Sequence, residues 1–320
     1  MEGCWEGILD FRFMIKRKTI AIILGLIICG FVIYGICNIS TDAGQVLLPS
    51  AEPQTLYENV LAPPPLPDPI DFCGEKAPMS LYWVREGIER EIIIQCYQHS
   101  RTLLTLKRST RFFPEIEKIL QEEKVPEDLK YLCIAESNLE NVVSPAKATG
   151  FWQFMEATGK LYGLEINDQV DERYHLEKAT RAACKYLLKL KKQFGSWALA
   201  AAAYNMGEGG LQKNMKEQEI DNYWDLFLNQ ETSRYVSRCI AYKLIFENQK
   251  LYNIRIPATD FYKPLEYKEI VVNKSIEDLR IYCSENKILF RELKELNPWL
   301  RGISLTVATG KSYVLKVPNI

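Results

Sequence analysis

Hydrophobic residues recur with a helical period along residues 81–251. One apolar stripe consists of Phe112, Phe113, Ile116, Ile119 and Leu120, and a second of Ala179, Ala182, Ala183, Tyr186, Leu187 and Leu190. Spacings of three and four residues place such side chains on one face of a helix. No run in this region has the two-residue period of a strand. The pattern therefore predicts an all-helical domain over residues 80–256.

A further helix is expected over residues 197–204, between two specific end signals. Ser196 is suited to cap the first turn, and Gly207 is suited to end the helix. The alanine-rich interior permits unusually close packing against neighbouring helices. This segment is therefore predicted to lie inside the domain.

The most hydrophobic stretch of the chain is residues 19–37, which contains no charged residue and follows Lys16, Arg17 and Lys18. Its length matches a membrane-spanning helix of about 17–25 residues better than the shorter apolar core of a cleaved signal. The preceding cations favour an orientation with the rest of the chain outside the cytoplasm. We expect a single-pass anchor with an extracytoplasmic, periplasmic domain. A lipoprotein modified at Cys37 and a cleaved, secreted form are the alternatives.

Proline-rich segments separate the predicted domains. Residues 39–79 carry many prolines and little periodicity, which favours an extended, semi-rigid spacer. Residues 257–266 are interpreted in the same way. The chain is thus divided into a tail and anchor (1–38), a linker (39–79), a helical domain (80–256), a short linker (257–266) and a C-terminal unit (267–320).

The C-terminal unit has the pattern of two strands enclosing two short helices. Residues 268–272 are predicted as the first strand and residues 313–318 as the closing strand. Ser275, with Asp278 three residues later, resembles a capping box that starts the first helix. A second helix is predicted from Phe290 to its stop at Pro298. The order is therefore βααβ.

One helix carries a carboxylate where its apolar face predicts a hydrophobic residue. This helix is expected to start at Pro126, because proline suits the first helical position. Leu129, Leu132, Cys133 and Glu136 then fall on one face. A carboxyl group among apolar side chains loses hydration, and its pKa rises. Glu136 is therefore a candidate general acid, or alternatively a residue that reaches water at the helix end or pairs with a lysine.

Composition excludes several classes of function. The formal net charge is -1 and no long basic run is present, which argues against nucleic-acid binding. Two histidines cannot build a His-rich metal site, and no pair of cysteines has the C-x-x-C spacing. We expect no metal and no cofactor. Cys133 and Cys184 lie on apolar faces, where buried free thiols are the default and a disulfide between them is the alternative.

Three short motifs, in this order and spacing, carry a resemblance to a known family. They are Ala135-Glu136-Ser137, Gly150-Phe151-Trp152-Gln153 and Ala203-Tyr204-Asn205, followed by a segment Glu231-Thr232-Ser233-Arg234-Tyr235-Val236. Together they resemble the catalytic domain of the soluble lytic transglycosylase superfamily, and among its members the membrane-bound type D enzymes. The resemblance covers about residues 92–254. It implies a lysozyme-like helical fold and cleavage of the β-1,4 bond between N-acetylmuramic acid and N-acetylglucosamine.

The resemblance also implies roles for seven residues. Glu136 would act first as acid and then as base, which leaves a 1,6-anhydro ring and consumes no water. The residues implied to contact the substrate or to support Glu136 are Ser137, Gly150, Gln153, Tyr204, Asn205 and Tyr235. The other nearby acids lie in polar or loop-like contexts: Glu140, Glu156, Asp168, Asp171 and Glu172.

The C-terminal unit is similar to a LysM module, which binds glycans that contain N-acetylglucosamine. Its opening differs, because Asn273-Lys274-Ser275-Ile276 replaces the usual Gly-Asp-Thr-Leu. A packing role against the helical domain is the alternative. The expected partners are peptidoglycan strands and, through the anchor, the membrane. Two other functions remain open: a hydrolase related to goose-type lysozyme, and a peptidoglycan-binding scaffold without catalysis.

Overall fold

The computed structural model describes residues 62–319 of the chain. The predicted anchor at residues 19–37 and the first part of the predicted linker lie outside the described residues. No helix within residues 62–319 is long and apolar enough to cross a membrane. By their contacts, residues 62–319 belong to one compact unit.

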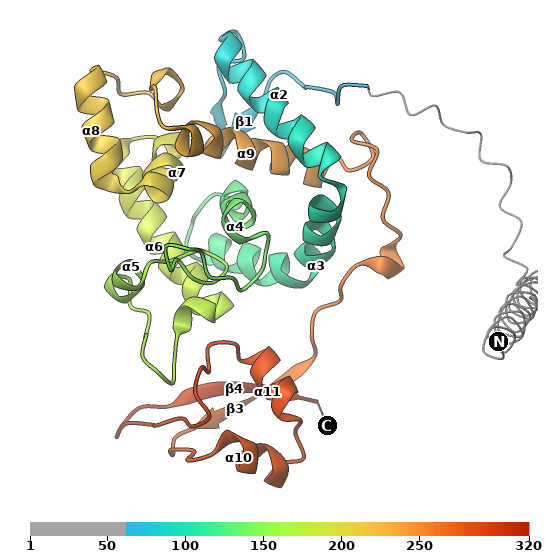
Figure 1. The fold of residues 1–320 in the computed structure, drawn as a ribbon, viewed down its shortest axis with the longest axis vertical. Coiled ribbons are helices and arrows are strands. Elements are labelled where there is room, and N and C mark those ends of the chain that lie inside the picture. Colours follow the sequence, from blue (N-terminus) through green and yellow to red (C-terminus); the bar gives the residue numbers. More distant parts are fainter. Residues whose placement is uncertain (1–61, 320) are drawn as a thin grey trace, which may run out of the picture. The chain divides into compact units, whose positions relative to one another are not determined.

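Helices account for most of this unit, as the periodicity predicts (Figure 1). The helical part contains a small hairpin and eight α-helices: β1 (Asp71–Phe72), β2 (Glu75–Lys76), α2 (Tyr82–Tyr97), α3 (His99–Glu122), α4 (Lys130–Ser137), α5 (Glu156–Leu161), α6 (Leu176–Phe194), α7 (Trp197–Met206), α8 (Glu208–Gln218) and α9 (Gln230–Glu247). Short 3₁₀ turns lie at Glu127–Leu129, Glu172–Tyr174, Tyr223–Asp225 and Ala258–Asp260. The C-terminal part contains β3 (Tyr267–Val272), α10 (Leu279–Glu285), α11 (Phe290–Leu296) and β4 (Tyr313–Pro318).

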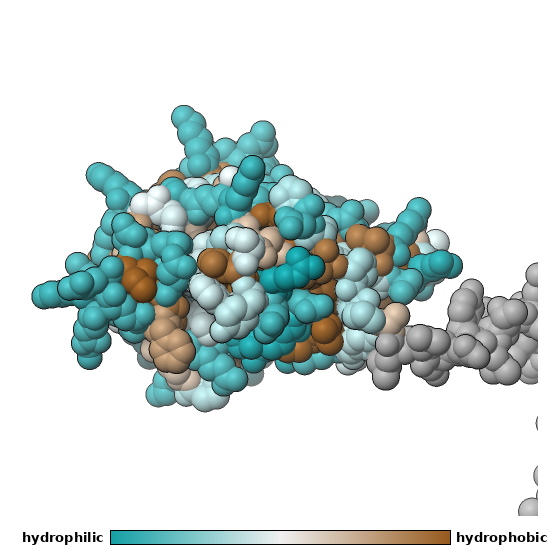
Figure 2. Space-filling model, turned by 90° about the horizontal axis from the view of Figure 1, so that it is seen from above, coloured by the Kyte–Doolittle hydropathy of each residue, from teal (hydrophilic) through white to brown (hydrophobic). Residues whose placement is uncertain are grey.

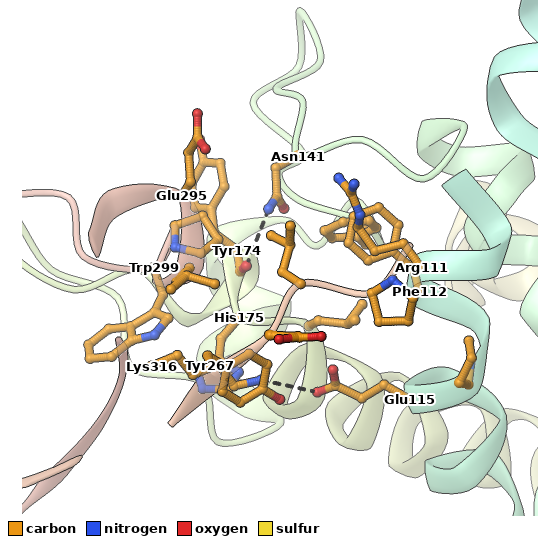
Figure 3. A pocket seen from close by; sticks show the side chains of 18 of the residues that line it. Arg111, Phe112, Glu115, Asn141, Tyr174, His175, Tyr267, Glu295, Trp299 and Lys316 are labelled. Atoms are coloured by element: carbon orange, nitrogen blue, oxygen red, sulfur yellow. Dashed lines mark hydrogen bonds and ion pairs between the residues drawn. The ribbon is translucent and has the colours of Figure 1, made fainter. Parts of the chain in front are cut away.

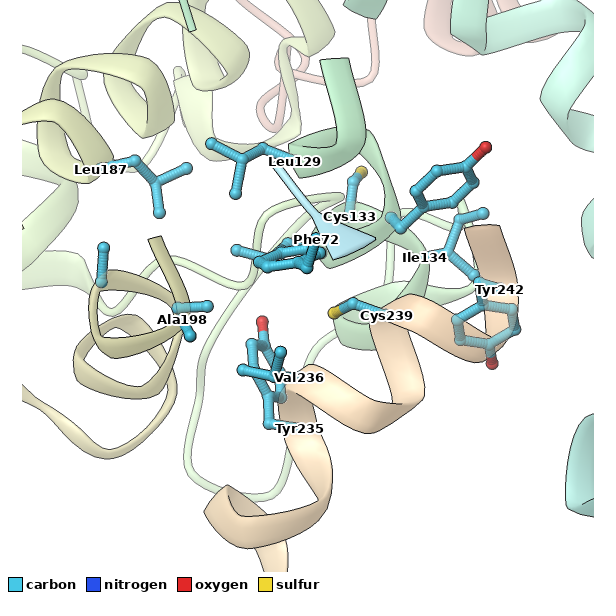
Figure 4. Close-up of a cluster of buried hydrophobic side chains, with 14 of the residues drawn as sticks. Phe72, Leu129, Cys133, Ile134, Leu187, Ala198, Tyr235, Val236, Cys239 and Tyr242 are labelled. Atoms are coloured by element: carbon cyan, nitrogen blue, oxygen red, sulfur yellow. The ribbon is translucent and has the colours of Figure 1, made fainter. Parts of the chain in front are cut away.

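Helix α4 lies at the centre of the helical part, with α2, α3, α6, α7 and α9 around it (Figure 1). Leu129, Leu132, Cys133 and Ile134 are fully buried in this core. Figure 4 shows how side chains from α4, α7 and α9 meet there. Seen from above, the surface is mainly hydrophilic with small separate hydrophobic patches (Figure 2). The apolar stripes of the sequence have therefore formed one core around the short helix that carries Glu136.

The two end signals predicted for α7 are confirmed. The Ser196 hydroxyl accepts a hydrogen bond from the Leu199 amide at 3.1 Å, and Gly207 follows the last helical residue. Residues 198–203 are buried. Small side chains thus allow α7 to pack closely against α6 and α9.

The last part of the predicted linker is folded onto the helical part. Ile70, Phe72, Ala77 and Met79 are all buried, and Phe72 points into the core beside Leu129 (Figure 4). The Cys73 amide also donates to an Asp128 carboxylate oxygen at 2.7 Å. The linker prediction is therefore wrong for residues 70–79, because these isolated apolar residues form a tight hairpin too short to show a period.

The C-terminal part has the predicted βααβ order. Strands β3 and β4 pair antiparallel, from Tyr267 opposite Pro318 to Val272 opposite Tyr313. Helix α10 begins later than predicted, since Asp278 rather than Ser275 is its N-cap and accepts from the Arg280 amide at 2.7 Å. Ser275 instead accepts from the Val307 amide at 3.0 Å and holds the loop before β4.

The C-terminal part shares a hydrophobic core with the segment between α5 and α6. Val170 and Tyr174 belong to the same buried cluster as Trp299 and Leu300. The Asp171 amide donates to the Trp299 carbonyl oxygen at 2.9 Å, and the Arg301 amide to the Gln169 carbonyl oxygen at 2.8 Å. The C-terminal part therefore packs against the segment between α5 and α6.

All six cysteines within residues 62–319 are free thiols. Cys133 and Cys184 are fully buried, as predicted from their helix faces, and they form no disulfide with each other. Burial raises the pKa of both thiols, because a thiolate loses hydration in an apolar core. These cysteines are packing residues.

Candidate active site

The local sequence before α4 explains where Glu136 lies. The helix predicted to start at Pro126 begins with a 3₁₀ turn at Glu127–Leu129, and the α-helix α4 itself begins at Lys130. Lys130 forms ion pairs of 2.6 Å with Glu117 and Glu127. Asn138 ends the helix in the left-handed conformation, with φ of 52°. Glu136 therefore projects from the last turn of a buried helix.

The Glu136 carboxyl group is partly buried and has one direct hydrogen-bond partner. The Tyr235 hydroxyl of α9 donates to Glu136 Oε1 at 2.5 Å. Burial raises the pKa of Glu136 to about 7. The hydrogen bond from Tyr235 opposes this rise, the charge of Glu231 adds to it, and the charge of Arg238 opposes it. A carboxyl group with this pKa exchanges a proton readily near neutral pH.

Ser137 connects the helix end to the following loop. Its hydroxyl lies 2.8 Å from the Phe151 carbonyl oxygen and 3.0 Å from the Cys133 carbonyl oxygen. The Ser137 side chain is buried. The residue predicted to support Glu136 thus fixes the loop beside it.

Gly150 is required by the backbone of that loop. Its φ is +83°, and a Cβ atom there would lie 2.0 Å from the Arg173 carbonyl oxygen. A side chain at this position would therefore collide with the backbone before the start of α6. The structure gives Gly150 a role in close packing, and its contact with substrate stays a prediction.

Gln153 folds back on the same loop in this structure. Its Nε2 atom donates to the Gly150 carbonyl oxygen at 2.7 Å and to the Val142 carbonyl oxygen at 3.1 Å. Gln153 also has a positive φ of 49°. The side chain thus stabilises the loop, and its contact with a sugar stays a prediction.

Tyr204 and Asn205, at the end of α7, attach that helix to the loop and to α9. The Tyr204 hydroxyl donates to the Trp152 carbonyl oxygen at 2.6 Å, and burial raises the pKa of Tyr204. The Thr232 hydroxyl donates to Asn205 Oδ1 at 2.9 Å. The predicted residues are therefore linked: Tyr235 to Glu136 directly, and the others through the loop carbonyl groups or α9.

Four of the five other acids near the motifs are bound to cations. Their partners are Arg108 for Glu140, Lys160 for Glu156, Arg173 for Asp171 and Lys178 for Glu172. Asp168 is exposed in the loop before the C-terminal contact. None of them contributes to the pKa of Glu136. They offer no direct partner for that carboxyl group.

Two charged residues near Glu136 are not predicted by the sequence patterns. Glu231 and Arg238 form an ion pair of 3.1 Å on α9, and both influence the pKa of Glu136. With Tyr235 they follow the spacing i, i+4, i+7, which places all three on one helical face. This spacing is the feature of the sequence that could have identified Glu231 and Arg238. It points to Glu136 only when α9 is known to pack against α4.

A cavity of about 760 Å³ lies elsewhere, between α3 and the C-terminal part (Figure 3). Phe112, Tyr174, His175, Trp299 and Lys316 are among its lining residues, whereas Glu136 is not. His175 stacks on Trp299 with ring centroids 5.9 Å apart. This cavity is therefore distinct from the surroundings of Glu136.

Comparison with known proteins identifies two domains. Residues 114–227 match the transglycosylase SLT domain, and residues 268–320 match the soluble lytic transglycosylase C-terminal LysM-like domain. The membrane-bound lytic murein transglycosylase D of Escherichia coli strain K12 is 31% identical over 253 residues, which cover 76% of this chain and 54% of that protein. A putative tributyltin chloride resistance protein of Alteromonas sp. strain M-1 is 33% identical over 113 residues, which cover 34% of this chain and 55% of that protein.

Among solved structures, the 70 kDa soluble lytic transglycosylase of Escherichia coli aligns with a TM-score of 0.37 and 21% identity, over 47% of this chain and 26% of that chain. The present chain spans about half the length of the curated relatives that it matches. The predicted resemblance is confirmed by both domain matches and by the 31% identity. The chain thus contains an SLT domain, which carries Glu136, and a LysM-like domain at its C-terminus.

Proposed function

We propose that this protein is a peptidoglycan lytic transglycosylase with Glu136 as its only catalytic carboxyl group. The observation that carries this proposal is the setting of Glu136, whose pKa burial raises to about 7 and whose Oε1 accepts from Tyr235. A carboxyl group near this pKa can both give and take a proton within one reaction cycle. The SLT match and the murein transglycosylase relative indicate the substrate class.

The proposed reaction has two proton transfers at the same carboxyl group. Protonated Glu136 gives its proton to the glycosidic oxygen, and the N-acetylglucosamine side leaves. The 2-acetamido group of N-acetylmuramic acid stabilises the positive charge at C1. Glu136, now a carboxylate, takes the proton of the C6 hydroxyl while O6 bonds to C1. The product is 1,6-anhydro-N-acetylmuramic acid, and no water is consumed.

The surroundings of Glu136 favour this cycle over ordinary hydrolysis, which uses two carboxyl groups on either side of the bond. Glu231 is the one other acid whose charge affects the pKa of Glu136, and it is exposed and paired with Arg238. A carboxylate engaged in this way is poorly suited to activate a water molecule.

The deciding experiment is digestion of purified peptidoglycan by the protein, with the muropeptides identified by mass spectrometry. We expect anhydro-muropeptides from the wild type and none from Glu136→Gln. Glu156→Gln is the matched control, because Glu156 is exposed and paired only with Lys160. Reducing ends would indicate a hydrolase of the goose-lysozyme kind. Absence of any product would indicate a scaffold.

We further propose that residues 267–320 bind glycan strands and that the enzyme acts outside the cytoplasm. The LysM-like match and the name of the membrane-bound relative support these two points. Retention of Glu136→Gln protein on peptide-free glycan strands, compared with a variant altered in the C-terminal part, tests the first. Fractionation of cells that express the full chain tests the second.

A further inference from the structure

One turn of helix α9 holds side chains that come from two other helices. The Tyr235 hydroxyl donates to Glu136 Oε1 of α4 at 2.5 Å, and the Thr232 hydroxyl donates to Asn205 Oδ1 of α7 at 2.9 Å. Because Thr232 and Tyr235 are three positions apart, their Cβ atoms are about 5–6 Å apart on one helix face. Burial, and after it the charge of Glu136, raises the pKa of Tyr204, the residue before Asn205. The same turn of α9 therefore holds Asn205 close to Glu136.

The contact with Thr232 selects one orientation of the Asn205 amide group. Thr232 is 1% exposed, and a buried hydroxyl proton needs an acceptor. Within residues 62–319, that acceptor is Asn205 Oδ1. An amide rotated by about 180° has nearly the same shape, but it would place its N–H₂ group against Thr232. The hydroxyl proton of Thr232 would then be left without an acceptor, which disfavours the rotated amide.

The selected orientation leaves two N–H donors of Asn205 free. Within residues 62–319, Asn205 Nδ2 donates to no acceptor, although Oδ1 accepts from Thr232. In the same part of the chain, none of the buried polar atoms that lack a partner belongs to Asn205, so Nδ2 reaches solvent. An amide held at its oxygen and open at its nitrogen is suited to donate to a ligand. The hydroxyl and acetamido oxygens of a sugar are acceptors of this kind.

The backbone of Thr232 is held without help from its hydroxyl group. The Thr232 amide donates to Asn229 Oδ1, the cap of α9, at 2.9 Å. The Thr232 carbonyl oxygen accepts from the Tyr223 hydroxyl at 2.9 Å. The hydroxyl is therefore not needed to start α9 or to fix its first turn. Its specific partner is the Asn205 side chain.

We propose that Thr232 is a positioning residue, whose hydroxyl orients the Asn205 amide so that Nδ2 donates to an oxygen of the sugar bound beside Glu136. This inference rests on the proposed function, because the sugar is the substrate of that reaction. Thr232 touches Asn205, and Asn205 touches the sugar. Without the hydroxyl, the amide takes both orientations. In the rotated one, Oδ1 faces the sugar oxygen and repels it.

The test removes the hydroxyl and keeps the shape of the side chain. We expect Thr232→Val to lower kcat/KM on peptidoglycan strands by about tenfold, as for loss of one hydrogen bond. Thr232→Ser, which keeps the hydroxyl, should recover most of this loss. In Asn205→Ala protein, adding Thr232→Val should change kcat/KM by less than about twofold, because no amide remains to be oriented. Thr105→Val is the matched control, since that buried hydroxyl donates to the Arg101 carbonyl oxygen of its own helix.

The pH profile separates an orienting role from a general loosening of α9. If Thr232→Val loosened α9, Tyr235 would release Glu136, and the pKa of Glu136 would rise. The decline in kcat/KM above about pH 7 would then move to higher pH. We expect the decline to stay where it is while kcat/KM falls at every pH. A moved decline, equal losses with and without the Asn205 amide, or no loss at all would overturn the proposal.

A binding measurement separates this proposal from the proposed function. Calorimetry with Glu136→Gln protein and peptide-free glycan strands should show weaker binding when Thr232→Val is added. The same addition to Glu136→Gln protein that also carries Asn205→Ala should leave binding unchanged. Equal binding in the first comparison would overturn the role of Thr232. Wild-type protein that forms no anhydro ends would instead refute the transglycosylase function, and the binding comparison would still decide the role of Thr232.

Discussion

Tyr235 donates a hydrogen bond to Glu136 Oε1 at 2.5 Å, although the two residues lie 99 positions apart in the chain. The bond stabilises the charged form of Glu136, while burial stabilises the neutral form. Burial is the larger effect, so the pKa rises to about 7. The hydrogen bond from Tyr235 thus keeps the pKa of Glu136 low enough for the carboxyl group to release its proton near neutral pH.

Replacing Tyr235 by phenylalanine should shift the pH profile of the reaction. In the proposed mechanism the first step needs protonated Glu136, so kcat/KM of the wild type should fall above about pH 7. Without the Tyr235 hydroxyl the pKa of Glu136 rises, and this decline should move to higher pH, with a lower maximum. Tyr223→Phe is the control, because its hydroxyl donates to the Thr232 carbonyl oxygen instead. An unmoved decline in Tyr235→Phe would contradict the assignment.

Neutralising the two members of the Glu231–Arg238 pair should shift the same profile in opposite directions. Glu231 raises the pKa of Glu136 and Arg238 lowers it. The decline in kcat/KM should therefore move to lower pH in Glu231→Gln and to higher pH in Arg238→Gln. Because Glu231 is exposed, its effect should be small and should weaken with added salt. Shifts of the same sign in both variants would refute this electrostatic account.

The stability of the protein should also depend on Glu136. Its pKa is raised from 4.5 to about 7 on folding, so the folded state binds the proton more tightly than the unfolded state. The favourable contribution is complete below about pH 4.5 and is lost as pH rises to about 7. Relative to the wild type, Glu136→Gln should gain up to about 3 kcal/mol between pH 4.5 and pH 8. Urea unfolding at both pH values measures this, with Glu156→Gln expected to show no such gain.

Gly150 should tolerate alanine far less well than Gly163 does. Both have positive φ, but a Cβ at Gly150 would lie 2.0 Å from the Arg173 carbonyl oxygen, whereas a Cβ at Gly163 meets nothing within 4 Å. Gly163→Ala should cost about 1 kcal/mol of unfolding free energy for conformation alone. Gly150→Ala must also move the backbone, so we expect a loss of 3 kcal/mol or more, to order of magnitude. Similar losses in both variants would mean that the loop adapts without strain.

Local patterns predicted the elements of the fold well, because each depends on near neighbours in sequence. The spacing Leu129, Leu132, Cys133 marked the buried face of α4 and singled out Glu136, and Ser196 capped α7 as expected. The predicted βααβ order of the C-terminal part also appears in the structure.

Such local patterns could not predict contacts between segments that are distant in the sequence. The hairpin of β1 and β2, Asp71–Lys76, is too short to show a period, and the Asp278 cap competes with an equally plausible Ser275. Glu231 and Arg238 matter only because α9 lies against α4. Likewise, nothing in the local sequence of residues 165–174 signals that they form a shared core with residues 299–317.

That shared core should connect the C-terminal part to the loop beside Glu136. The Trp299 carbonyl oxygen accepts from the Asp171 amide, and the Asp171 carboxylate holds Arg173 at 2.7 Å. Arg173 Nη1 in turn donates to the Phe154 carbonyl oxygen at 3.2 Å, in the loop that contains Gly150. A change at Trp299 therefore has a continuous path of contacts to the loop beside Glu136.

Trp299→Ala should loosen this path. Trp299 is 4% exposed and stacks between His175 and Tyr313, so its truncation should cost about 3–5 kcal/mol. Hydrogen exchange should become faster at the Asp171 amide. It should also become faster at the Thr149 and Phe154 amides, each of which donates to the carbonyl oxygen of the other residue. Trp83→Ala, at an exposed tryptophan, is the control. Exchange could instead become faster at Asp171 and stay unchanged at Thr149 and Phe154. Arg173 would then keep its contact with the loop after Asp171 had loosened, and the loop would not depend on the C-terminal part.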